Sequence, residues 1–556
     1  MTQSSTGNTQ TVMDAARAWL AEDPDPATRA ELEALLATVE AEGPDSEAAA
    51  DLADRFSGTL EFGTAGLRGA LGAGPNRMNR VVVLRAAAGL AAYLRDTGAT
   101  GPVVIGYDAR HNSDVFARDT AAVMTGAGIA ALTLPRAMPT PVLAASILAL
   151  GASAGVMVTA SHNPPQDNGY KVYLGDGSQI VPPADAEIAS RIAAVGALAD
   201  VPRGDGGTLI DEQVWHDYIA AAAAVPPSTE RDLNVVYTPM HGVGRETMQA
   251  VFERAGFTGV AVVSEQAQPD PDFPTVAFPN PEEPGAMDLA LALATERGAD
   301  IIIANDPDAD RCAAGIPDPA TGAWRMLRGD EVGALLGHDL LSRGVSGTYA
   351  NSIVSSSLLG TMARAAGRPF IETLTGFKWI GRLPELAFGY EEALGYCVDP
   401  IRVKDKDGIS AAVLLADLAA RLKAAGSSFA ARLDEIAREH GLHATDQLSV
   451  RVSDLTLISD AMARLRATPP TTLAGRAVTS AEDLAAGSAE LPPTEGLRYY
   501  LEGGARIIVR PSGTEPKLKC YLEVVVPVTG EVTEARAQAA TDLAALKSEI
   551  GAALGL

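Results

Sequence analysis

The chain has 556 residues, of which 47% are hydrophobic and 21% are charged, proportions typical of a globular protein. At roughly 150 residues per domain, this length predicts three to four domains, each able to bury a core. The formal net charge of -26 argues against nucleic acid as a partner, because binding a phosphate backbone requires a basic surface.

The N-terminal part of the chain predicts helices. Residues 11–56 contain the amphipathic run ELEALLATVEAE and are interrupted by Pro24, Pro26 and Pro44. We interpret residues 1–56 as a helical extension. No basic segment leads into an apolar stretch, so no signal peptide is expected, and the cytoplasm is the expected compartment.

The uncharged stretch 137–160 is not expected to cross a membrane, because prolines and glycines divide it into a short helix and a strand. From residue 57 onward, apolar strands alternate with polar loops and alanine-rich helices, as in VVIGYDARHNS, LNVVYTPMHGVG and GTYANSIVSS. This alternation predicts an α/β protein with mixed or parallel sheets. Three widely spaced cysteines predict neither a disulfide framework nor a zinc site.

The hexapeptide TASHNP, residues 159–164, follows the apolar run AGVMVT, which predicts a strand buried on both faces. Two prolines follow Ser161 and His162 closely, so the serine is expected to be exposed on a rigid turn at the carboxyl end of the strand. We interpret this turn as a nucleophile loop. A capped turn is the structural alternative, because Ser and Asn favour such positions.

The heptapeptide NDPDADR follows the apolar run IIIA and carries Asp306, Asp308 and Asp310. In an extended loop, alternate carboxylates converge on one side, and three hard oxygen ligands suit Mg²⁺. An EF-hand is excluded, because Arg311 and Pro317 occupy positions where that loop needs glycine and glutamate. A solvated acidic turn is the alternative.

Further segments carry groups suited to sugars and phosphate. TLTGFKW, GYEEALGY and KDKDG lie between residues 373 and 408, and their paired glutamates suit hydrogen bonds to sugar hydroxyls. Lys378 and Lys406 are candidates to face phosphate, with solvated lysines as the alternative. RPSGTEPK, residues 510–517, lies between two β-rich runs and combines a guanidinium, two hydroxyls and a glycine, which predicts an anion-binding loop.

In this order, TASHNP, DPDADR, GYEEALG and RPSGTEPK resemble the four signature loops of the α-D-phosphohexomutase superfamily, which includes phosphoglucomutases and phosphomannomutases. FGTAGLRG, residues 62–69, resembles the family's N-terminal substrate loop. The resemblance implies three similar α/β/α domains with mixed sheets and a smaller C-terminal α+β domain around a central cleft. The expected domains are 57–205 with the phosphoserine loop, 206–321 with the metal-binding loop, 322–440 with the sugar-binding loop and 441–556 with the phosphate-binding loop.

The resemblance also implies a mechanism. A phosphate on the loop serine passes to a sugar phosphate, and the bisphosphorylated intermediate reorients and returns its other phosphate to the serine. Mg²⁺ is the expected cofactor, and a sugar bisphosphate such as glucose 1,6-bisphosphate is the implied activator. The implied positions are Ser161, His162, Lys171 and Arg68 for catalysis, Ser161, Asp306, Asp308 and Asp310 for the metal, and Arg311, Thr375, Gly376, Lys378, Glu391, Glu392, Lys406, Arg510, Ser512, Gly513 and Thr514 for the substrate.

Two departures from the family pattern concern the sugar. Many bacterial members have histidine where this chain has Phe377 followed by Lys378, and the sugar loop often has serine where this chain has Ala393. TLTGFKWIG, FGYEEALGY and the N-terminal extension look more like the phosphoglucomutase-2/phosphopentomutase-like branch. We expect a mutase for 1-phospho and 6-phospho hexoses, glucose first and mannose second, with ribose or deoxyribose phosphates as the alternative.

Two other functional classes stay open. Asp306 and Asp308 after a strand also resemble the nucleophile pair of haloacid-dehalogenase-type phosphatases, which would make the chain a phosphosugar hydrolase. A non-catalytic phosphosugar sensor would need the phosphate-binding loop but no phosphorylatable serine. The sequence does not distinguish a monomer from a homodimer.

Overall fold

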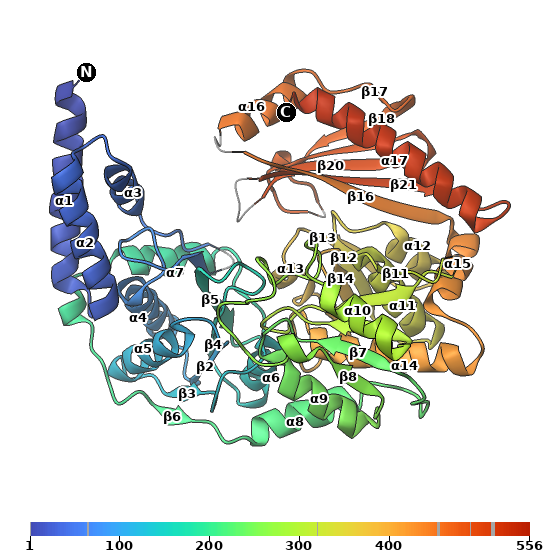
Figure 1. Ribbon diagram of the computed structural model, residues 1–556, viewed down its shortest axis with the longest axis horizontal. Helices are drawn as coiled ribbons and strands as arrows, with labels where there is room; N and C mark the ends of the chain where they lie inside the picture. Colours follow the sequence, from blue (N-terminus) through green and yellow to red (C-terminus); the bar gives the residue numbers. More distant parts are fainter. Residues whose placement is uncertain are drawn as a thin grey trace. The chain divides into compact units, whose positions relative to one another are not determined.

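The computed structural model describes residues 2–63, 66–319, 321–452, 456–489, 491–512 and 517–555, with side chains from residue 9 onward. The chain divides into two compact units, and Figure 1 labels the helices and strands along it. Unit 1 contains Met1–Gly315 and Cys397–Asp417, and unit 2 contains Ile316–Tyr396 and Leu418–Leu556.

The N-terminal extension consists of three helices. Asp25 and Ser46 accept hydrogen bonds from backbone N–H groups at the starts of the second and third helices, and Pro26 occupies the first turn of the second. Apolar side chains from all three form a small core that includes Met13, Leu32 and Leu52. The first helix begins earlier than the expected residue 11. The helices are α1 (Thr2–Glu22), α2 (Pro26–Glu42) and α3 (Glu47–Arg55).

The first sheet has the strand order β1-β5-β4-β2-β3-β6 and is mixed. β2 is parallel to β4 and β3, whereas β5 is antiparallel to β4 and β1. Every residue of β4 is buried, as its apolar run predicts. The elements are β1 (Leu67–Ala70), α4 (Arg80–Asp96), β2 (Val103–Tyr107), α5 (Ser113–Gly126), β3 (Ala131–Thr133), α6 (Thr140–Ala149), β4 (Ala154–Val158), β5 (Asp167–Leu174), α7 (Ala184–Ala193), the 3-10 helix η1 (Leu198–Asp200) and β6 (Thr208–Leu209).

The second sheet has the order β10-β9-β7-β8 in unit 1, with β7 parallel to β8 and β9 and β10 antiparallel to β9. It is therefore mixed like the first. Its elements are α8 (Gln213–Ala223), β7 (Val235–Thr238), α9 (Gly244–Ala255), β8 (Val260–Val262), η2 (Ser264–Gln266), α10 (Asp288–Arg297), β9 (Ile301–Ala304) and β10 (Ala313–Pro317).

The third sheet has the order β13-β12-β14-β15, and β12 is parallel to both of its neighbours. Helices α11, α12 and α15 belong to the same unit. Between residues 324 and 440 the chain forms, in order, β11 (Trp324–Met326), which is not a strand of this third sheet, α11 (Gly329–Ser342), β12 (Thr348–Ser352), α12 (Leu358–Ala365), β13 (Phe370–Thr373), α13 (Phe377–Ile380), β14 (Leu386–Glu391), β15 (Gly395–Cys397), α14 (Gly408–Ala424) and α15 (Phe429–His440).

The fourth sheet is antiparallel in the order β16-β21-β20-β19-β18-β17, with the long helix α17 packed on it (Figure 1). The expected fold class, mixed α/β sheets followed by an α+β domain, is confirmed, while the exact domain boundaries stay predictions. The elements are β16 (Leu442–Arg451), α16 (Thr456–Ala467), β17 (Thr472–Leu473), β18 (Arg476–Asp483), η3 (Leu484–Ala486), β19 (Leu497–Leu501), η4 (Glu502–Gly504), β20 (Arg506–Pro511), β21 (Lys517–Val526) and α17 (Val532–Leu554).

The segment 397–417 packs with unit 1 although the sequence on both sides of it belongs to unit 2. Tyr173 Oη and Gln179 Nε2 each donate a 2.7 Å hydrogen bond to Asp405. Tyr218 Oη donates to Asp407 at 2.7 Å. These buried contacts fasten the KDKDG loop to unit 1.

The three cysteines are buried and free. Within the described ranges, no helix combines the length and the apolarity that a membrane span requires.

Candidate active site

Ser161 lies in the loop after β4, and its side chain is buried, with 2% of the residue exposed. The expectation of an exposed serine is therefore wrong. Its φ of 54° lies in the left-handed region, which is unusual for a residue other than glycine. This conformation accompanies an inward-facing hydroxyl: Oγ donates to Asp306 Oδ2 at 2.8 Å and lies 3.2 Å from His162 Nδ1.

Arg110, in the loop after β2, holds the backbone of the serine loop. It is 4% exposed, its Nε lies 3.4 Å from Asp108 Oδ2, and its guanidinium stacks over the Phe273 ring at 4.9 Å. Sequence reasoning missed this residue, although β2 is the parallel neighbour of β4 and the arginine follows its carboxyl end. Its two terminal nitrogens donate to the carbonyl oxygens of Ser161 (2.8 Å), Pro164 (2.8 Å), Asp167 (3.1 Å) and Asn163.

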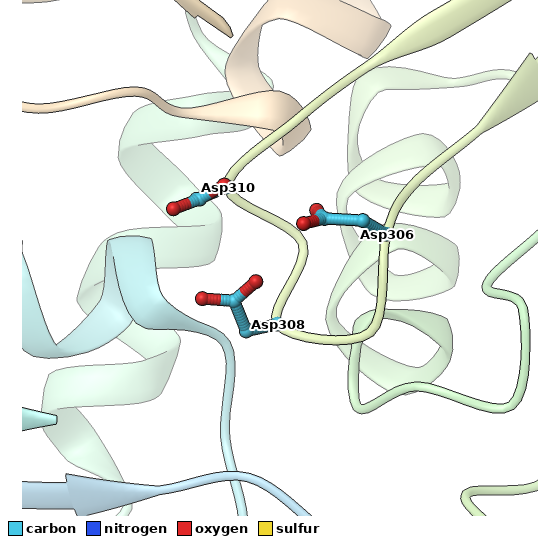
Figure 2. Close-up of side chains that lie close together, drawn as sticks. All are labelled: Asp306, Asp308 and Asp310. Atoms are coloured by element: carbon cyan, nitrogen blue, oxygen red, sulfur yellow. The ribbon is translucent and has the colours of Figure 1, made fainter. Parts of the chain in front are cut away.

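The three aspartates Asp306, Asp308 and Asp310 converge after β9 (Figure 2). All three are fully buried, and each offers a carboxylate oxygen within 4.8 Å of the others. The loop is a tight turn instead of the expected extended segment, because Ala309 has a φ of 55° and its N–H donates to the Asp306 carbonyl at 2.9 Å. This turn brings the alternating carboxylates together.

The electrostatics of these aspartates suit a cation. Burial and the charges of Asp308 and Asp310 raise the pKa of Asp306 well above its ordinary value. Burial also opposes ionisation of Asp310, but nearby lysines outweigh it and lower that pKa. Among the described residues, Asp308 Oδ1 and Asp310 Oδ1 are buried and accept no hydrogen bond. Buried oxygen acceptors without donors fit a hard divalent ion such as Mg²⁺.

Two lysines neutralise part of this charge. Lys171 on β5 places Nζ 2.7 Å from Asp308 Oδ2 and 2.9 Å from Asp310 Oδ2. Burial lowers the pKa of Lys171, but these two carboxylates outweigh it and raise the pKa, so the side chain is an ammonium. Lys406 Nζ lies 3.3 Å from Asp310 Oδ2 and 3.4 Å from Asp405 Oδ1.

Residues outside the aspartate turn also pack closely against it. Thr140, at the start of α6, donates its hydroxyl to Asp308 Oδ2 at 2.6 Å. A Cβ added at Gly408 would lie 2.1 Å from the Arg311 carbonyl, and one at Gly242 would lie 2.3 Å from Pro307 Cα. Only glycine permits these close backbone approaches. Thr140 and Gly242 were not identified from the sequence.

The remaining predicted residues of unit 1 surround the serine and the aspartates. Arg68 donates to Asn163 Oδ1 at 3.4 Å, and Arg311 Nε lies 3.8 Å from carboxylate oxygens of both Asp306 and Asp310. Burial, together with the charges of Arg311 and Arg68, lowers the pKa of His162 well below its ordinary value. The imidazole beside the serine is therefore neutral at physiological pH.

Unit 2 brings together predicted sugar-binding and phosphate-binding residues. Arg510 on β20 donates to Thr375 Oγ1 at 2.6 Å. Gly376 N donates to Glu391 Oε1 at 2.7 Å, and its φ of 105° suits glycine. Glu392 accepts a 3.2 Å hydrogen bond from the Ser355 hydroxyl.

The remaining predicted positions of unit 2 lie in the TLTGFKW and RPSGTEPK segments. Phe377 is 2% exposed and belongs to the core. Lys378 lies over the Trp379 ring at 5.9 Å. Ser512 N donates to the Lys517 carbonyl at 2.8 Å. Gly513 and Thr514 lie outside the described residues.

Comparison with known protein families finds matches to four domain models of a single family. Models described as phosphoglucomutase/phosphomannomutase alpha/beta/alpha domains I, II and III match residues 59–198, 213–318 and 328–439, and the C-terminal domain matches 449–539. The chain belongs to the phosphoglucomutase/phosphomannomutase family. The family consists of phosphosugar mutases, which are isomerases that relocate a phosphoryl group, and it depends on Mg²⁺. The chain is therefore a phosphosugar mutase.

Its relatives carry several activity names. A Haemophilus influenzae protein named "Probable phosphomannomutase" is 50% identical over 80% of this chain and 93% of its own length. The Mus musculus protein named "Phosphopentomutase" is 35% identical over 92% of this chain and 89% of its own. The crystal structure of a phosphoglucomutase/phosphomannomutase family protein from Burkholderia thailandensis shares the fold, with a TM-score of 0.67, 19% identity and coverage of 88% and 96%.

Proposed function

We propose that this enzyme interconverts 1-phospho and 6-phospho hexoses through a phosphorylated Ser161 and a bisphosphorylated sugar, with glucose phosphate as the first substrate and mannose phosphate as the second. The observation that most supports this is the buried Ser161 hydroxyl 2.8 Å from Asp306, one of three converging carboxylates. A phosphosugar sensor would need no buried serine at such a site.

Mg²⁺ would be held by Asp306, Asp308 and Asp310 together with an oxygen of the phosphate on Ser161. It would supply positive charge to the phosphoryl group during transfer. Arg68 and Arg311 add fixed positive charge on the protein side.

The two half-reactions each move one phosphoryl group and one proton. In the first, the bond between phosphorus and Ser161 Oγ breaks, a bond to a sugar hydroxyl oxygen forms, and the hydroxyl proton must leave while Oγ gains one. In the second, Ser161 Oγ attacks the other phosphate and gives up its proton, the bond between phosphorus and the sugar oxygen breaks, and that oxygen gains a proton. Neutral His162, with Nδ1 3.2 Å from Oγ, supports a role as the acceptor of that proton. Lys171, an ammonium, suits proton donation.

Arg510, with Ser512, Gly513 and Thr514, would grip the phosphate that is not transferred, by charge-assisted hydrogen bonds. Glu391 and Glu392 would accept hydrogen bonds from sugar hydroxyls. The same groups would serve the sugar in both orientations, so the substrate-binding groups of unit 2 would not need to change between half-reactions.

A phosphopentomutase is the second candidate, because the Mus musculus relative of that name aligns with 92% of this chain. A panel of glucose, mannose, ribose and deoxyribose 1-phosphates, assayed for the isomeric phosphate, ranks these substrates. Higher kcat/KM for both pentose phosphates than for both hexose phosphates would replace the hexose proposal.

Mapping of phosphate on the chain after incubation with glucose 1,6-bisphosphate tests the phosphoserine mechanism. We expect phosphate on the peptide that contains Ser161, and none on the corresponding peptide of the Ser161→Ala variant. Release of inorganic phosphate without isomer formation would indicate a phosphatase, and binding without either product would indicate a sensor.

A further inference from the structure

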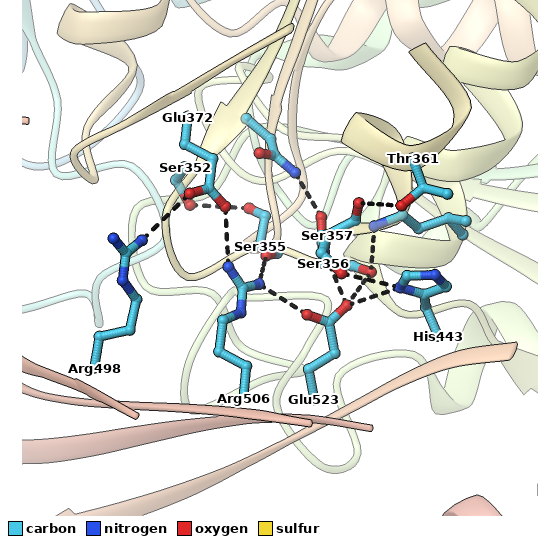
Figure 3. Close-up of polar contacts among 12 residues, drawn as sticks. Ser352, Ser355, Ser356, Ser357, Thr361, Glu372, His443, Arg498, Arg506 and Glu523 are labelled. Carbon is cyan, nitrogen blue, oxygen red and sulfur yellow. Dashed lines mark hydrogen bonds and ion pairs between the residues drawn. The ribbon is translucent and has the colours of Figure 1, made fainter. Parts of the chain in front are cut away.

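Unit 2 contains a buried polar network that joins the loop after β12 to the C-terminal sheet (Figure 3). At its centre is Arg506 on β20, which is 5% exposed. Its guanidinium lies 3.0 Å from Glu372 Oε1, 2.9 Å from Glu523 Oε2 and 2.5 Å from the carbonyl oxygen of Ser355. One side chain thus connects β13, β21 and the loop between β12 and α12.

Ser355 extends this network to the proposed sugar-binding pair. Its hydroxyl accepts from Glu392 N at 3.0 Å and donates to Glu392 Oε2 at 3.2 Å. Ser352 donates to the same carboxylate oxygen at 3.2 Å. The backbone segment whose carbonyl Arg506 holds therefore also fixes both the main chain and the carboxylate of Glu392.

The other end of the network leads to the proposed phosphate-binding arginine. Arg506 and Arg510 are four residues apart on one strand, so their side chains share a face and lie about 13 Å apart along it. Glu372, a partner of Arg506, precedes by three residues Thr375, whose hydroxyl accepts from Arg510 at 2.6 Å. The contacts of Arg506 with Glu372 and of Arg510 with Thr375 therefore fix how β20 is aligned with residues 372–375.

The central ion pair is better explained by positioning than by stability. Glu523, 3% exposed, accepts from Ser356 Oγ at 2.6 Å and Ser357 N at 2.8 Å, and lies 3.3 Å from His443 Nδ1. Burial opposes its ionisation, but the charge of Arg506 and hydrogen bonds from His443 and Ser356 lower its pKa to about 2. Apolar side chains could often fill such a volume at equal or greater stability, whereas an ion pair fixes geometry.

We propose that Arg506 is a positioning residue that sets the separation between Glu392 and Arg510, so that one sugar phosphate contacts both at once. This inference rests on the function proposed above. A ligand held at two points by a rigid frame binds far more tightly than either contact alone allows. Loss of the contacts of Arg506 should therefore weaken the binding of a ligand that contacts both Glu392 and Arg510. It should not change the binding of a ligand that contacts only one of them.

The variant Arg506→Lys keeps the charge but loses the planar fork that reaches several acceptors. Calorimetry in the Ser161→Ala background, where turnover is prevented, gives the Kd of glucose 1-phosphate, which spans both points, and of inorganic phosphate, which needs only the phosphate loop. We expect the first Kd to rise on the order of ten-fold or more and the second to stay unchanged. Arg498→Lys is the matched control, because Arg498 shares Glu372 as a partner at 3.3 Å, and it should change neither.

An unchanged Kd for glucose 1-phosphate in Arg506→Lys overturns the inference, and so does an equal rise in both Kd values, which would mean that Arg506 supports only the phosphate loop. If this variant does not fold, Ser355→Ala, which removes the hydroxyl that holds Glu392, replaces it with the same two expected results. A wild-type protein that binds glucose 1-phosphate but isomerises no sugar phosphate overturns the proposed function separately. Wild-type protein that binds neither glucose, mannose nor ribose 1-phosphate overturns both.

Discussion

Replacing Arg110 should disable the enzyme although this residue touches none of the proposed reacting atoms. Its guanidinium donates to carbonyl oxygens of four residues of the serine loop and faces Asp108. Arg110→Lys keeps one nitrogen and the charge, so at least one charged hydrogen bond, worth about 1.5 to 3 kcal/mol, is lost. A shift of about 1 Å in a reacting group costs about 100-fold in rate. We therefore expect kcat/KM to fall about 100-fold and unfolding free energy to fall by about 2 kcal/mol.

Steady-state mutase kinetics and urea unfolding measure the two effects. The matched control is Arg80→Lys, because Arg80 makes a similar forked ion pair with Asp119 in the same domain, 2.7 and 2.8 Å long, away from the serine loop. That exchange should leave kcat/KM near the wild-type value. Wild-type kcat/KM in Arg110→Lys, or an equal loss in Arg80→Lys, would refute the claim that Arg110 positions the serine loop.

Three further outcomes are expected. Ser161→Ala should abolish mutase turnover, and near-normal turnover measured alongside an unchanged circular dichroism spectrum would exclude the phosphoserine mechanism. EDTA should remove activity and Mg²⁺ restore it, whereas Asp308→Asn should leave little activity at any Mg²⁺ concentration; full activity in metal-stripped protein would contradict the metal assignment. Glu523 has its pKa lowered from 4.5 to about 2, so its ionised form contributes about 3 kcal/mol of stability that is complete above about pH 5 and is lost as the pH falls towards 2. Glu523→Gln should therefore be clearly less stable than wild type in urea at pH 7, with the difference shrinking below pH 5, and a pH-independent difference would disprove the ionised pair.

Local patterns were sufficient to predict the layered fold. The buried run before Ser161 and the β-rich runs around RPSGTEPK have the apolar, partly β-branched composition of strands, and prolines and glycines mark where they end. The prolines at 24, 26 and 44 likewise predicted breaks in the N-terminal helical region, and the structure has its helix boundaries beside them. Each of these signals lies within a few residues of the feature that it predicts.

Features that depend on distant partners could not be predicted in this way. The inward direction of the Ser161 hydroxyl involves Asp306, 145 positions further along the chain, and carbonyl contacts to Arg110. The turn that gathers the aspartates requires Ala309 in a left-handed conformation, which its residue type does not indicate. The roles of the predicted site residues stay predictions until the variants above are measured.

The attachment of KDKDG to unit 1 has a consequence for synthesis of the protein. Lys406 and the aspartates that accept from Tyr173 and Tyr218 lie within residues 405–407, which follow every strand of the third sheet in the chain. A ribosome will therefore have made the entire segment 316–396 before the half of the molecule that carries the serine and the aspartates can complete its interior. We expect nascent chains that stop before residue 405 to expose these tyrosines and to depend on chaperones, because domains fold as units during synthesis only when all of their segments have emerged.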